Sequence, residues 1–75
     1  MEVFPGISMD PDIPFWKPCI LGTRIDVATV VGALAAGETV ETVANEYALS
    51  MEQVRSALSY AAHVAAHMPA VRKAS

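Results

Sequence analysis

Disulfide bridges and long apolar runs are both missing from this 75-residue chain. Its single cysteine, Cys19, has no partner for an internal disulfide, the bond that stabilises many small secreted domains. The longest apolar stretches fall short of the roughly 20 residues that a membrane-spanning helix needs. Residues 1–12 contain no Lys or Arg, whereas a secretory signal begins with positive charge. We therefore expect a cytoplasmic protein that spans no membrane.

Basic residues are scarce, with five Lys and Arg against eight Asp and Glu and a net charge of -3. Strong non-specific attraction to nucleic acid requires many cations that neutralise phosphates, so this composition counts against it. Specific DNA binding remains possible, because a dimer can place a few cations at each half-site and use helix N-termini for other phosphates.

Apolar residues make up 53% of the chain and charged residues 17%, which predicts a folded domain and not a disordered one. A domain of this size buries only about 60% of the surface of its unfolded chain. Apolar surface is then left for another molecule to cover. We expect a homodimer or a higher oligomer.

Four of the five prolines lie in residues 1–18, where they disfavour a long helix. This segment is predicted to be an extended arm. Alternation of polar and apolar residues then predicts short strands at about 19–21 and 24–27, with Gly22 at a turn or bulge.

Helical spacing of apolar residues begins at Val27 and predicts helices at about 27–36, 40–47 and 51–68. Gly37 is expected to end the first helix and Thr39 to cap the second. Ser50 and Gln53 have the spacing of a capping box, and Pro69 ends the third helix before a tail at 69–75. The fold class is mainly α, with three helices in a domain at 19–68 preceded by a short extended or β-ribbon region.

The segment 38–68 fits a helix-turn-helix unit. Ala44 is small enough for a second helix to cross there, while Ala48 and Leu49 supply a small residue and an apolar plug in the turn. Apolar residues at Val43 and Val54 can pack across the crossing. Ala48 stands where glycine is usual in such turns.

If the third helix enters a major groove, the outward-facing residues of its first half should meet base edges. Arg55 can donate to guanine and Gln53 can pair with adenine. The alternative is that these residues solvate an exposed helix face, which the carboxylate of Glu52 favours. The predicted DNA-binding residues are Ser50, Met51, Glu52, Gln53, Arg55, Ser56 and Ser59.

One block of the sequence is Gly22-Thr23-Arg24-Ile25-Asp26-Val27, which is preceded by Lys17-Pro18-Cys19-Ile20-Leu21 and followed by a helical unit. This arrangement resembles the domain-of-unknown-function family numbered 433. The helical part of the resemblance includes Gly37-Glu38, Tyr47, Leu49 to Val54 and Ala57 to Ala61. It covers about residues 7–64. The Gly-Thr-Arg-Ile block is its most specific part.

The resemblance implies a homeodomain-like helix-turn-helix and a type II antitoxin that represses its own operon. Its partners would be operator DNA and a PIN-like ribonuclease toxin. Phe15 and Trp16 depart from the family, which has glycine before Lys-Pro, so this pair is expected on a partner-specific surface. The predicted partner-binding residues are Phe15, Trp16, Val64, His67, Met68, Val71, Arg72 and Lys73.

Several remaining residues each have more than one possible role. His63 and His67 share a helix face. They are either a pair of interface residues or two ligands of one metal ion, for which the sequence offers no third ligand. Arg24 fits either a brace between strand and helix or a phosphate contact, and Cys19 fits a small core residue. No catalytic arrangement is present, so we expect no enzyme, cofactor or metal. The alternative functions are a pure interaction module and, third, an accessory subunit of an enzyme.

Overall fold

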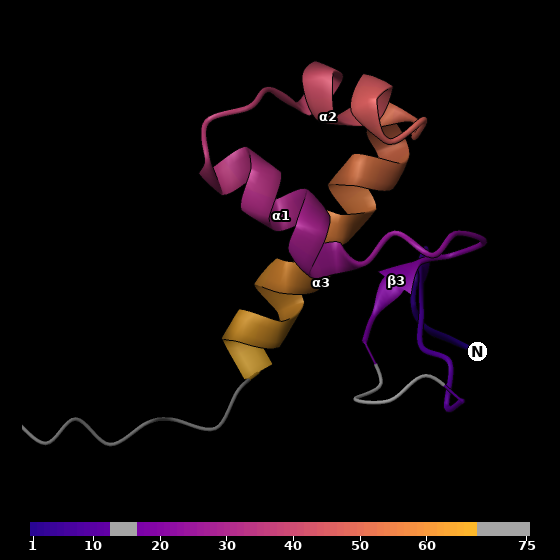
Figure 1. Ribbon diagram of the computed structural model, residues 1–75. Helices are drawn as coiled ribbons and strands as arrows, with labels where there is room; N and C mark the ends of the chain where they lie inside the picture. Colours follow the sequence, from indigo (N-terminus) through magenta and orange to yellow (C-terminus); the bar gives the residue numbers. More distant parts are fainter. Residues whose placement is uncertain (13–16, 68–75) are drawn as a thin grey trace, which may run out of the picture.

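The computed structural model describes residues 1–12 and 17–67, which form a small sheet followed by three helices (Figure 1). The sheet is antiparallel, in the order β1-β2-β3. The helices follow without further strands in these residues, so the mainly α prediction is confirmed at this level. The elements are β1 Glu2–Phe4, β2 Ile7–Ser8, β3 Cys19–Ile20, α1 Val27–Ala35, α2 Val40–Glu46 and α3 Met51–His67.

The sheet joins the N-terminal region to the rest of the domain. Ile7 of β2 lies opposite Ile20 of β3, and both side chains are fully buried. Gly6 makes the β1–β2 turn with φ +81°, and a Cβ there would come within 2.9 Å of the Ser56 hydroxyl on α3. Glycine is therefore required at this turn for its backbone geometry and for the close approach of α3.

The predicted strand at 24–27 is wrong. Within that segment, Asp26 alone forms an isolated bridge with Cys19, and Val27 already begins α1. The Asp26 carboxylate accepts a hydrogen bond of 2.7 Å from the Thr29 backbone N–H and so caps the helix. Capping ends the extended run before a second strand can form.

The predicted helix boundaries agree with the structure to within one residue in the described part of the chain. Gly37 follows α1 with φ +104°, and Thr39 caps α2 by accepting a 3.0 Å hydrogen bond from the Thr42 N–H. At α3, the Ser50 hydroxyl accepts from the Gln53 N–H at 3.0 Å, and the Gln53 side-chain oxygen accepts from the Ser50 N–H at 2.8 Å. The predicted capping box is confirmed.

The turn between α2 and α3 brings the two helices against each other. Leu49 is buried, and its N–H donates to the Ala44 carbonyl at 2.8 Å. Ala44 is 6% exposed, and Val54 of α3 is fully buried in the same core. The small residue, the apolar plug and the packed partner therefore lie where the sequence pattern predicted them.

Ala48 in this turn has φ 56°, a left-handed backbone conformation that residues other than glycine rarely adopt. Ala48→Gly is expected to stabilise the fold by about 0.5–1 kcal/mol, because relief of the backbone strain outweighs the added entropy of the unfolded chain. Urea denaturation monitored by helical circular dichroism measures the change. Destabilisation by this substitution would contradict the left-handed turn.

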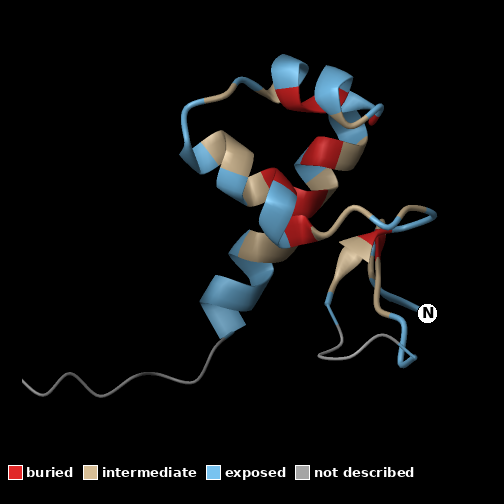
Figure 2. Ribbon diagram, in the orientation of Figure 1, coloured by how far each residue is buried: buried red, intermediate tan, exposed pale blue. Residues whose placement is uncertain are grey.

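Buried side chains gather where the three helices and the sheet meet (Figure 2). The second half of α3 runs beyond this core, and residues 62–67 are all exposed. No helix in residues 1–12 and 17–67 is long and apolar enough to cross a bilayer. The core residues are Ile7, Ile20, Val27, Val30, Val43, Ala44, Leu49, Val54 and Ala57.

Candidate nucleic-acid and partner-binding surfaces

The first half of α3 has one face open to solvent. Glu52, Arg55 and Ser59 are exposed and, at spacings of three and four residues, lie along the same side of the helix. Met51 is exposed at the start of the helix. Four of the seven predicted DNA-binding residues thus form one continuous surface, which we call the α3 face.

Ser50, Gln53 and Ser56 lie in different surroundings. Ser50 and Gln53 bind each other in the capping box, although Ser50 itself is exposed. Ser56 is half-buried beside Gly6 of the β1–β2 turn. The packing of the sheet on α3 therefore partly covers Ser56, through a contact between distant segments that no local sequence pattern reveals.

Two shallow depressions flank the α3 face. One, of about 300 Å³, lies between α2 and the start of α3 and brings Glu41 and Asn45 beside Ser50 and Met51. The other, of about 340 Å³, lies between α3 and the turns of the sheet, where Pro5 and Leu21 approach Glu52. Asn45 was missed by the sequence pattern, yet its exposed amide borders the surface.

Arg55 is the one cation on the α3 face. Within residues 1–12 and 17–67 it forms no ion pair, since the single pair found there joins Lys17 to Asp26 at 3.8 Å. Glu41 and Glu52 lie close to the first turn of α3. Among the residues that the structure describes, the α3 face therefore offers a single guanidinium, with Glu52 three residues away, and it can neutralise few phosphates.

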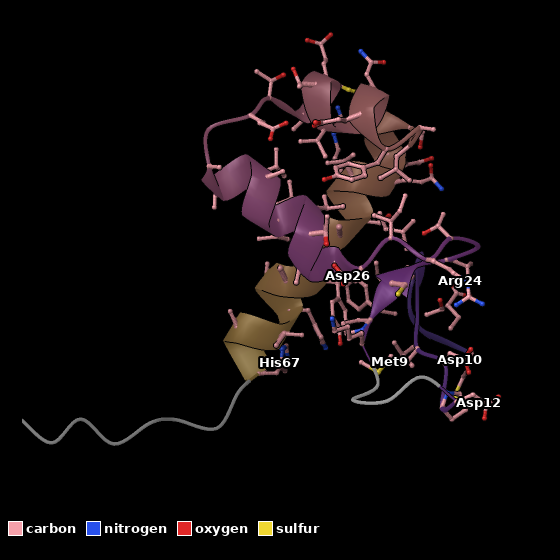
Figure 3. All side chains as sticks on the ribbon, in the orientation of Figure 1. Met9, Asp10, Asp12, Arg24, Asp26 and His67 are labelled. Carbon is pink, nitrogen blue, oxygen red and sulfur yellow. The ribbon has the colours of Figure 1, made fainter. Side chains whose placement is uncertain are left out.

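A polar cavity of about 490 Å³ lies beside the sheet, where Arg24 and Asp10 reach its lining (Figure 3). Arg24 is exposed and has no hydrogen bond or ion pair in the described residues. No contact in these residues therefore supports the possibility that Arg24 braces the strand against a helix. Burial, followed by the nearby Asp26 charge, raises the pKa of the Cys19 thiol. Cys19 is therefore a protonated, half-buried thiol and a poor nucleophile.

Asp26 connects this cavity to α1. Hydrogen bonds from the Thr29 side chain and backbone N–H lower the pKa of the Asp26 carboxyl, with a smaller contribution from Lys17. Asp26 is consequently ionised at neutral pH, which favours its capping of the positive N-terminal end of α1.

The end of α3 carries an aromatic cluster. The His63 and His67 rings stack with centroids 4.2 Å apart, and Phe4 of β1 lies 5.1 Å from His63 and 5.4 Å from Tyr60. Nδ1 of His67 is 2.8 Å from the His63 carbonyl oxygen. The described residues contain no group of three or more His, Cys, Asp or Glu side chains that could hold a metal ion. The histidines thus form a stacked pair at the exposed end of the helix, where Figure 3 labels His67.

An apolar groove of about 340 Å³ runs between α1 and the second half of α3. Val64, one of the predicted partner-binding residues, lines it and is 36% exposed. His67 lies at the end of α3 among the aromatic cluster. The groove is lined by Lys17, Pro18, Asp26, Val27, Ala28, Val31, Tyr60, Ala61, Val64 and Ala65.

The other predicted partner-binding residues lie outside the described residues: Phe15, Trp16, Met68, Val71, Arg72 and Lys73. The described part of the partner surface therefore consists of the end of α3. It presents two sides, the groove at Val64 and the stacked histidines.

Comparison with known proteins identifies relatives of much greater length. "Uncharacterized protein Rv2308" of Mycobacterium tuberculosis is 30% identical over 59 residues, which cover 79% of this chain and 25% of the relative. "Putative antitoxin VapB45" of the same organism is 36% identical over 53 residues, which cover 71% of this chain and 22% of the relative. The chain thus spans about a quarter of the length of these curated relatives.

No solved structure matches the chain significantly. Residues 7–61 match the family described as "Protein of unknown function (DUF433)". This segment runs from β2 through the first part of α3 and includes two of the three strands, the turn at Ala48 and the α3 face. The chain belongs to this family.

Proposed function

We propose that this protein is the antitoxin of a type II toxin–antitoxin system, which neutralises a PIN-like ribonuclease and represses its own operon by binding operator DNA. The observation that carries the DNA-binding part is the exposed α3 face, which follows a tight turn from α2. Support for the antitoxin part comes from the relative named "Putative antitoxin VapB45".

In the DNA-binding part, α2 and α3 act as a homeodomain-like helix-turn-helix. The burial of Ala44 and Leu49 fixes the crossing of the two helices, and the exposed α3 face is free to enter a major groove. Arg55 donates to a guanine, since a guanidinium matches its O6 and N7 atoms. Glu52 and Ser59 lie within reach of neighbouring base edges on the same side of the helix.

Charge limits how this protein binds DNA. The sequence of α2, from Val40 to Glu46, contains two carboxylates and no Lys or Arg. Since Arg55 is assigned to a guanine, phosphate contacts must come from backbone N–H groups at helix N-termini and from residues beyond α2 and α3. Two copies on one operator would double the few cations available, which is the reason to expect a homodimer or higher oligomer on DNA.

The toxin surface is assigned to the side of α3 that bears the stacked histidines, near Phe4, and to the predicted residues outside the described part of the chain. Trp16 is the largest apolar residue among these, and tryptophan is frequent at the centres of protein interfaces. Arg72 and Lys73 would face the acidic metal-binding site that the family resemblance implies for the toxin.

The experiment for the antitoxin part uses a purified PIN-like ribonuclease, the class of toxin proposed as the partner. An equimolar amount of the full chain is expected to abolish RNA cleavage, and Trp16→Ala is expected to weaken inhibition by about 10-fold or more, as loss of a central interface tryptophan does. Arg55→Ala serves as the control and should inhibit like the wild type. Full ribonuclease activity in excess wild-type protein would contradict the antitoxin role.

The second candidate is an interaction module that never binds DNA. The two carboxylates of α2, and Glu52 three residues before Arg55, favour it, because carboxylates repel phosphates. This candidate predicts a stable complex with a partner protein and no preference for the operator over unrelated DNA.

A further inference from the structure

The apolar groove between α1 and α3 is a surface that the core leaves uncovered. Val27, Ala28 and Val31 form one wall, and Ala61, Val64 and Ala65 contribute to the other. The second half of α3 continues the helix past its contacts with the core, so this groove opens to solvent. An exposed apolar groove of this kind favours a binding partner.

We infer that this groove is the homodimer interface and that its occupant is the second half of α3 from a second copy of the chain. Residues 56–67 contain no Asp, Glu, Lys or Arg. This segment is therefore both a wall of the groove and a helix whose own surface suits an apolar groove. A two-fold axis seats each copy's segment in the other's groove, as an isologous dimer requires.

The side chains of this segment permit close helix packing. Ala61 and Ala65, which line the groove, are both small, so the backbone of a second helix can approach closely. Val64 lies between them in the sequence and supplies an apolar side chain that can contact the groove of the other copy. Bulkier or charged residues at these positions would hold a second helix away.

Charge also favours a second copy at this surface over other faces. Each chain has a net charge of -3, so two copies repel each other wherever their carboxylates meet. Glu38, Glu41 and Glu46 lie on α2 or just before it, Glu52 lies in the first turn of α3, and none of these four lines the groove. Asp26 is the one carboxylate lining the groove, and it is paired with Lys17 at 3.8 Å.

The size of the surface is sufficient for a dimer of moderate affinity. Ten residues of α3 are about 15 Å long, and a helix with its side chains is about 10 Å wide. Seating both segments would bury on the order of 1,000 Å² in total, which is near the lower limit for a specific interface. We expect dissociation in the micromolar range.

The proposed dimer leaves the α3 face free. Arg55 and Val64 are nine residues apart, and at 3.6 residues per turn they lie on opposite sides of the helix. The second copy therefore covers the groove side and not the side assigned to DNA. Val64, grouped by the sequence pattern with the toxin-binding residues, belongs in this inference to the contact between the two copies.

The test compares two neighbouring exposed alanines in the full-length chain. Ala65 lines the groove and Ala66 does not, so Ala65→Glu and Ala66→Glu add the same charge on different sides of α3. Sedimentation equilibrium through the micromolar range measures the dimer without DNA or toxin, so its outcome is separate from that of the proposed function. Circular dichroism confirms equal helix content in both variants.

Wild type and Ala66→Glu are expected to form dimers. Ala65→Glu is expected to weaken dimerisation by about 100-fold or more, because the symmetric interface would bury two unpaired carboxylates. A wild-type protein that stays monomeric, or an Ala65→Glu variant that dimerises as well as Ala66→Glu, would overturn the inference. A monomer whose groove is covered only in the toxin complex would assign the groove to the toxin instead.

Discussion

Arg55→Ala is expected to weaken binding to operator DNA by about 1–3 kcal/mol, or roughly 5- to 150-fold, because a bidentate contact to guanine is lost. The fold should be unaffected, since Arg55 is exposed and forms no ion pair within residues 1–12 and 17–67. Fluorescence anisotropy with a labelled operator duplex measures the affinity, and thermal unfolding checks the fold.

Arg24→Ala provides the matched control for charge. It removes the same single positive charge from an exposed arginine that lines the polar cavity beside the sheet, outside the α3 face. Its effect on operator affinity should be smaller than that of Arg55→Ala. Equal losses from both substitutions would indicate a general effect of net charge, and unchanged affinity in Arg55→Ala would remove the α3 face from the DNA contact.

Ile7→Ala is expected to destabilise the protein by about 2–5 kcal/mol, because the side chain is fully buried between the sheet and the helices. A core of this size rarely supplies more than about 3–5 kcal/mol of net stability, so the variant is expected to be largely unfolded. Urea denaturation measures the loss. Ile7→Val is expected to cost about 0.5–1.5 kcal/mol, so this variant should remain folded and its free energy of unfolding can be measured.

Val3→Ala is the control within the same hairpin. Val3 is 43% exposed on β1, so its substitution should change stability by less than about 1 kcal/mol. A loss from Ile7→Ala no larger than that from Val3→Ala would show that the N-terminal hairpin does not belong to the core.

Local signals allowed the helical part of the fold to be predicted from sequence. The capping partners Ser50 and Gln53 are three residues apart, and Gly37 follows the C-cap residue of α1, Ala36. Each signal acts within one turn of the backbone, so it does not depend on the rest of the fold. The turn at Ala48 and Leu49 was predicted for the same reason, although its left-handed alanine replaces the usual glycine.

Contacts between distant segments were not predicted. The extended N-terminal arm was anticipated from its prolines, but nothing in its sequence pairs Ile7 with Ile20. The position of Ser56 follows from the approach of Gly6, some fifty residues earlier in the chain. The groove likewise needs α1 and the end of α3 side by side. Such pairings are set by tertiary packing and leave no periodic pattern in the sequence.

The predicted strand at 24–27 failed because two local signals competed. Alternation in Arg24-Ile25-Asp26-Val27 favours a strand, whereas Asp26 three residues before Thr29 favours a helix cap. The cap prevailed, since the Asp26 carboxylate satisfies a backbone N–H of α1 that otherwise lacks a partner. Its pairing with Cys19 remains as a single bridge.

The most direct test of the proposed role of α3 is operator affinity measured as salt concentration rises, for the wild type and Arg55→Ala. We predict that the wild type prefers the operator to an unrelated duplex of equal length and that its affinity falls as salt rises. Arg55→Ala should lose most of that preference. Equal binding of the wild type to both duplexes at low salt, or no binding to either, would contradict the assignment of the α3 face to DNA.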